Sequence, residues 1–122
     1  MQHVFIVFVG SGIGGVIRYL IAQIMNKYDY SLPIHTLVAN MMACLILGIV
    51  IAYTIGNHER TMLRLFIAVG ICGGMSTYST FSYETLAMAM NQQWLGFLLY
   101  AILTFLLCLI MTFVGLQIGN KF

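Results

Sequence analysis

The sequence has very little charge. Only 7% of its 122 residues are charged, 61% are hydrophobic and the mean hydropathy is +0.99. Soluble domains carry charge on roughly a quarter of their residues. The shortage therefore predicts an integral membrane protein. The formal net charge of +2 is also too small to indicate a nucleic-acid partner.

Cysteine is scarce as well. Cys44, Cys72 and Cys108 are far apart in the sequence, and each lies in an apolar segment. This odd number and wide spacing match neither a disulfide framework nor a zinc site. The three therefore read mainly as small, weakly polar packing residues. The sequence also lacks an ATP-binding or redox motif.

Four apolar segments are long enough to cross a bilayer core, which needs about 20 residues. The first has no basic residue before it and no clear cleavage site, so we expect a retained span rather than a signal peptide. The connections are short, which predicts a single all-α transmembrane domain over residues 1–122 with antiparallel helices. The expected spans are residues 3–25, 34–55, 62–90 and 94–118.

The basic residues are distributed almost evenly between the two membrane sides. With four spans, both termini and the 56–61 loop share one side, which holds Arg60, Arg64 and Lys121. The other side holds Lys27, with Arg18 in the last third of the first span. Such a small bias is a weak orientation signal. It allows insertion in both orientations, and four short spans enclose too little interior for a wide cavity. Both points favour a dimer, of which an antiparallel pair is one form.

Two ionisable residues lie within the expected spans. Such residues are costly in a membrane and indicate function by default. Arg18 could reach the lipid headgroups, or it could face a water-filled vestibule and raise the local concentration of anions. Glu84 is near the far end of the third span, where an interfacial position is an equal alternative.

Weakly polar residues recur within the other spans. Asn40 either links two helices by a hydrogen bond or offers an N–H group to a passing anion. In the fourth span every fourth residue is weakly polar, which fits either close packing or the wall of a narrow pore. This stripe consists of Tyr100, Thr104, Cys108 and Thr112.

The first span contains pairs of small residues four positions apart. Gly10 with Gly14, and Ser11 with Gly15, form small-xxx-small pairs. Such pairs let two membrane helices approach closely. We therefore expect them to serve mainly in helix packing.

The third span holds the densest cluster of hydroxyl groups, in the stretch GICGGMSTYSTFSYET at residues 70–85. It is too long for one simple helix, and we expect a break near Gly73–Gly74. Broken helices occur at membrane depth only where the backbone is buried or lines a cavity. Freed carbonyl groups can also bind a cation. Residues 73–82 are thus the predicted functional core.

Three stretches together resemble the Fluc (CrcB) family of small four-span fluoride channels, over essentially the whole chain. GSGIGGVIRY resembles the family pattern G-G-x-x-G-A-x-x-R-Y, and TLVANMMACLILG resembles T-L-x-V-N-x-x-G-x-x-x-x-G. GICGGMSTYSTFS resembles G-x-x-G-G-x-T-T-F-S-T-F-S. The departures from these patterns are Ser11, Gly15, Ala39, Ala43, Ser76 and Tyr78.

The resemblance implies an antiparallel, dual-topology homodimer in a bacterial inner membrane. Two narrow pores would export F⁻ passively and lower cytoplasmic fluoride. A structural Na⁺ ion would lie at the dimer centre, held by backbone carbonyls of both copies at the positions of Gly73 and Ser76. A serine in place of the family's threonine keeps that carbonyl group.

The resemblance also implies a set of pore residues. An aromatic pair would turn electropositive ring edges toward the anion, and a polar track would supply further donors. Arg18 and Glu84 match a family arginine and a frequent acidic residue at the vestibule. The hydroxyl of Tyr78, which replaces the usual Phe, could donate to fluoride or narrow the pore. The pair is Tyr78 and Phe81, and the track is Asn40, Ser79, Cys108 and Thr112.

Two alternatives compete with the channel, and none of the three is an enzyme. A small multidrug/proton antiporter needs a carboxylate within the bundle, but the first span carries Arg18 and no acid. Glu84 is the only carboxylate that could serve. A non-transporting membrane subunit would instead tolerate Asn40→Ala or Phe81→Ala, whereas a channel would lose conduction.

Overall fold

The computed structural model describes residues 1–27, 32–56 and 58–121. In this part of the chain all regular structure is helical. The elements are α1 (Gln2–Met25), α2 (Ile34–Thr54), the 3₁₀ turn η1 (His58–Arg60), α3 (Thr61–Arg64), the π-helix η2 (Leu65–Cys72), α4 (Gly73–Met75), α5 (Tyr78–Met90) and α6 (Trp94–Gly119).

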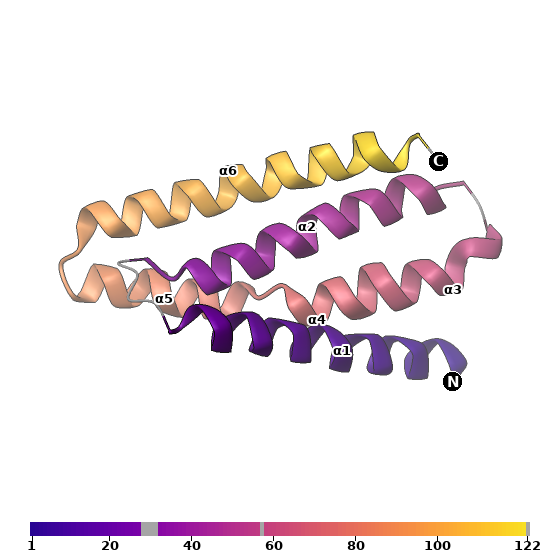
Figure 1. Cartoon of the computed structure of the whole chain (residues 1–122), viewed down its shortest axis with the longest axis horizontal. Helices are drawn as coiled ribbons and strands as arrows, with labels where there is room; N and C mark the ends of the chain where they lie inside the picture. The colour runs from indigo at the N-terminus through magenta and orange to yellow at the C-terminus, as the bar shows by residue number, and fades with distance from the viewer. Residues whose placement is uncertain (28–31, 57, 122) are drawn as a thin grey trace.

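These elements form four membrane-length helical segments, called rods below. Neighbouring rods in the sequence run in opposite directions (Figure 1). The rods are α1, α2, the series from α3 to α5, and α6, and each is long and apolar enough to cross a membrane. The four-helix transmembrane architecture is therefore confirmed. The N- and C-termini lie at the same end (Figure 1), as an even number of spans requires. α6 packs along α2, and α1 packs along η2 and α4.

Small residues bring α1 into backbone contact with the third span. Gly10 and Gly14 are buried, and a Cβ atom on either would collide with the backbone of the third span, at Gly70 and Ile71 respectively. This confirms the predicted packing role of the Gly10–Gly14 pair. Gly15 has open space around its Cα atom, so it plays no such role within the chain.

Gly14→Ala is expected to destabilise the protein. The new methyl group meets the Ile71 carbonyl, so α1 must shift away from the third span. Overpacking of this kind costs about 1–3 kcal/mol. Thermal unfolding in detergent measures the loss. Gly12→Ala is the matched control because nothing lies near its Cα, and an equal loss in both variants would contradict the packing account.

The third span is broken, but not where the sequence suggested. The helix continues through Gly73–Gly74 to Met75. The backbone then becomes extended at Ser76 (φ −74°, ψ 151°) and Thr77 (φ −149°, ψ 114°) before α5 begins. The expected break near Gly73–Gly74 is thus displaced toward the C-terminus.

Helix packing explains the glycine at position 74. A Cβ atom on Gly74 would collide with the backbone of Ser11 on α1. That glycine therefore permits close contact between α1 and α4 rather than a bend. Immediately before α4, residues Leu65–Cys72 form a π-helix. π-helical segments are rare and are frequent at functional sites, and the sequence pattern did not predict this one.

Candidate ion pathway

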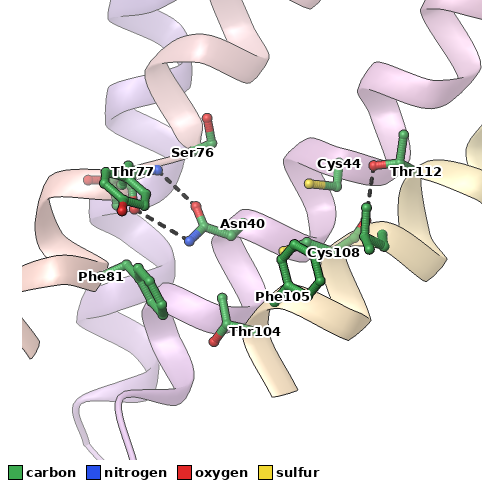
Figure 2. Close-up of a pocket in the computed structure, with 11 residues that line it drawn as sticks. Asn40, Cys44, Ser76, Thr77, Phe81, Thr104, Phe105, Cys108 and Thr112 are labelled. Atoms are coloured by element: carbon green, nitrogen blue, oxygen red, sulfur yellow. Dashed lines mark hydrogen bonds between the residues drawn. The ribbon is translucent and has the colours of Figure 1, made fainter. Parts of the chain in front are cut away.

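A pocket of about 350 Å³ lies beside the break, where α2, α5 and α6 meet (Figure 2). Its wall mixes amide, hydroxyl, thiol and aromatic groups. The lining residues are Asn40, Cys44, Ser76, Thr77, Tyr78, Phe81, Thr104, Phe105, Cys108, Leu109 and Thr112.

Asn40 holds the broken backbone together. The Thr77 N–H donates to Asn40 Oδ1 at 2.8 Å, and Asn40 Nδ2 reaches the Thr77 carbonyl oxygen at 3.5 Å (Figure 2). A buried backbone group without a partner would be costly, so Asn40 replaces the helical bond that the Thr77 N–H loses at the break. A side-chain amide has two N–H donors, and the contact with Thr77 uses one of them.

Thr77 also starts the next helix. Its Oγ1 accepts a hydrogen bond from the Thr80 N–H at 3.2 Å and donates to the Thr80 hydroxyl at 3.0 Å. The Ser79 hydroxyl is 3.2 Å from the same oxygen. This is an N-cap, which satisfies one of the free N–H groups at a helix start. Part of the hydroxyl cluster is therefore explained by the break itself.

The same bonds release two carbonyl groups from the helix. In an uninterrupted α-helix, Thr77 N–H would bond to the Gly73 carbonyl and Thr80 N–H to the Ser76 carbonyl. Here they bond to Asn40 and to the Thr77 side chain instead. Gly73 is exposed and Ser76 is partly exposed. Released carbonyls at the end of a half-helix suit a Na⁺ ion, so these residues fit the implied site.

The aromatic pair lies at the start of α5. The ring centroids of Tyr78 and Phe81 are 6.0 Å apart at an interplanar angle of 42°. The ring centroid of Phe81 is also 5.4 Å from that of Tyr100. Because Tyr100 is completely buried, it holds the Phe81 ring in place. Tyr78 is 81% exposed, so its ring and hydroxyl face away from the chain's own core.

The stripe on α6 divides between two environments. Thr104, Cys108 and Thr112 line the pocket, whereas Tyr100 does not. Thr112 donates its hydroxyl proton to the Cys108 carbonyl at 2.9 Å. The Thr104 hydroxyl is buried and lies beside the Tyr100 hydroxyl, although it forms no hydrogen bond of standard geometry among the described residues.

Glu84 is held inside the bundle. It accepts hydrogen bonds from the Thr36 hydroxyl and from the Tyr100 hydroxyl, both at 2.8 Å. The imidazole Nε2 of His35 lies 3.3 Å from the same carboxylate. This geometry joins α2, α5 and α6, and it places Glu84 in an internal network that the sequence did not predict.

Tyr100→Phe is expected to lower the free energy of unfolding by about 1–3 kcal/mol. The change removes one of the two hydroxyl donors from the partly buried Glu84 carboxylate. Denaturation in mixed detergent micelles would measure the loss. Tyr83→Phe is the control because Tyr83 is largely exposed. Equal stability of the two variants would contradict a structural role for the Glu84 network.

Arg18 faces a second, smaller cavity of about 230 Å³. This cavity lies between α1, α2 and the start of α5. It shares Thr77 with the pocket beside the break, so the two adjoin at that residue. Its lining residues are Gly15, Arg18, Tyr19, Ala22, His35, Thr36, Thr77 and Thr80.

The pocket contains most of the predicted pore residues. Ser79 is the exception, since it is exposed beside the break and outside the lining. Four lining residues were missed: Cys44, Thr77, Phe105 and Leu109. Cys44 lies one helical turn after Asn40 and so shares its face, a signal that the sequence did contain.

Comparison with known proteins shows a close family likeness. A family model described as "CrcB-like protein, Camphor Resistance (CrcB)" matches residues 5–116. A "Fluoride-specific ion channel FluC" of Shewanella sp. (strain W3-18-1) is 37% identical over 119 residues, covering 97% of this chain and 96% of the relative. A "Fluoride-specific ion channel FluC 1" of Staphylococcus aureus (strain bovine RF122 / ET3-1) is 38% identical over 123 residues, covering 98% of each chain.

A third relative agrees with these two. The "Fluoride-specific ion channel FluC" of Flavobacterium psychrophilum is 35% identical over 123 residues, covering 99% of each chain. All three relatives are bacterial, and the chain has four membrane-spanning helices. It is therefore a multi-pass protein of the bacterial plasma membrane.

Proposed function

The chain belongs to the CrcB-like family, and we propose that it is a fluoride channel through which F⁻ leaves the cell passively. The observation that carries the proposal is the pocket beside the helix break, whose wall gathers several hydrogen-bond donors at membrane depth. It supports transport rather than mere helix association, because a packing interface would not need a pocket lined by several hydrogen-bond donors.

The chemistry of the wall suits a small, strongly hydrated anion. Moving such an ion out of water is costly unless several donors replace its hydration at once. We assign this role to the second N–H of Asn40, the Thr104 hydroxyl and the weak donor Cys108. None of them carries a full charge, so the anion can be bound and released.

The aromatic pair would supply a second kind of contact. The edges of aromatic rings are electropositive, so Phe81 can face the anion without holding it tightly. Tyr78 adds a hydroxyl donor to such an edge. Because Tyr78 and Ser79 are exposed, we assign both to a stretch of the pathway that a second copy of the chain would complete.

We further propose an antiparallel homodimer with a structural Na⁺ at its centre. The released carbonyls of Gly73 and Ser76 lie where another copy could approach, and two copies would double the number of oxygen ligands. Bound Na⁺ would supply a fixed positive potential close to the pathway. Arg18 would add a second positive charge at the adjoining cavity and raise the local concentration of anions.

The antiporter alternative finds no support in the geometry. Exchange of protons for a cation requires a carboxylate that is open to the substrate. Both oxygens of Glu84 accept hydrogen bonds from buried or partly buried side chains. The carboxylate is therefore suited to holding helices together.

Growth on fluoride tests the function in cells. A bacterium that lacks its own fluoride exporter should grow in millimolar fluoride when it expresses this chain. Weakly acidic medium should increase the difference, because neutral HF then crosses the membrane more readily. A lack of protection, with the protein present in the membrane, would contradict fluoride export.

A further inference from the structure

A titratable side chain lies in the cavity that holds Arg18. His35 is the second residue of α2, at the end of the bundle where α1 ends and α6 begins (Figure 1). Its side chain is 29% exposed and lines this cavity beside Arg18. On its other side, Nε2 is 3.3 Å from Glu84 Oε1. His35 thus connects an internal carboxylate to an open cavity.

Among the residues that the structure describes, few other charged groups face this position. Among the described residues, α1 contributes Arg18 and Tyr19 to the cavity, α5 contributes Glu84, and α6 contributes the Tyr100 hydroxyl that donates to Glu84. With a neutral imidazole, the charges of Arg18 and Glu84 cancel. With a protonated imidazole, the same group of residues carries a net positive charge.

We propose that His35 is part of the fluoride entrance, and that its protonation raises the rate at which fluoride reaches the pore. This inference rests on the proposed function. A positive charge in a cleft concentrates anions at its mouth. An imidazolium has two N–H donors, so one can bond to Glu84 while the other faces the cavity.

The consequence is a channel that carries more fluoride in acid. Histidine is the side chain whose charge ordinarily changes between pH 5 and 8. A falling pH therefore adds the charge and raises the current, whereas a rising pH removes it. This pH dependence matches the amount of fluoride to be exported, because acid increases the amount of neutral HF that enters a cell.

Single-channel currents of the reconstituted full chain test the proposal, in symmetrical fluoride at low ionic strength, where screening is weak. Between pH 7.5 and pH 5.5 the wild-type current should rise about two- to five-fold. His35→Gln should abolish this rise. His35→Lys, which is charged at both pH values, should give the acid-level current at pH 7.5 as well. A merely structural histidine would not produce this opposite pair of pH profiles.

His3→Gln is the matched control, because His3 is exposed near the start of α1, at the opposite end of the bundle (Figure 1). It should keep the wild-type pH profile. A His35→Gln channel that still responds to pH would overturn the role of His35 but not the proposed function. A wild-type fluoride current that does not respond to pH would do the same. A wild-type protein that passes no fluoride at any pH would overturn the proposed function itself.

Discussion

Asn40→Ala is expected to abolish fluoride flux, with a loss of at least about 100-fold. The substitution removes a donor from the pocket wall and both contacts with the Thr77 backbone. The Thr77 N–H would then be buried without a partner, at about 1–3 kcal/mol, and the Thr77 carbonyl would lose its contact with the Asn40 amide. The break would rearrange, and with it the placement of Ser76 and Tyr78. Fluoride release from liposomes measures the effect.

The Asn40 result needs controls for folding. Asn120→Ala changes the same residue type at the exposed end of α6 and should conduct like wild type. Gel filtration and thermal unfolding would show whether the Asn40 variant remains assembled. An assembled Asn40→Ala protein with wild-type flux would contradict the role given to the break.

Phe81→Ala is expected to have the second largest effect, a loss of fluoride flux of about 10-fold or more. Phe81 lies between the rings of Tyr78 and Tyr100, at 6.0 and 5.4 Å between centroids. Removing it deletes an aromatic ring that lines the pocket and frees Tyr78 to move. The initial rate of fluoride release is the measurement.

Two further variants separate the causes of a Phe81 effect. Phe5→Ala removes an aromatic ring from the exposed face of α1 and should leave the flux unchanged. Tyr78→Phe keeps the ring and removes only the hydroxyl, so any change in fluoride flux isolates that donor. Wild-type flux in Phe81→Ala would show that the aromatic pair lies outside the pathway.

The sequence predicted the architecture well, because membrane spans depend mainly on apolar length. The first and last residues of each observed span differ by at most one position from those expected from the sequence. The close contact at Gly10 and Gly14 was also predictable, because small residues at helical spacing have few other uses in a membrane. Both signals are local in sequence.

The break was harder to place because its position depends on another helix. Gly73–Gly74 is the weakest point by local propensity, but the backbone opens where Asn40 can satisfy Thr77. Those two residues are 37 positions apart. The network of Glu84 with Tyr100 and Thr36 is equally non-local. Pairings of this kind cannot be read from spacing along one helix.

Ion-selective flux is the most direct test of the account. Purified protein would be reconstituted into liposomes loaded with potassium fluoride, and valinomycin would be added to balance the charge. An electrode would follow external fluoride, with potassium chloride liposomes measured in parallel. Rapid fluoride release without chloride release is the predicted result. Equal release of both ions, or release of neither, would contradict a fluoride-selective pathway beside the helix break.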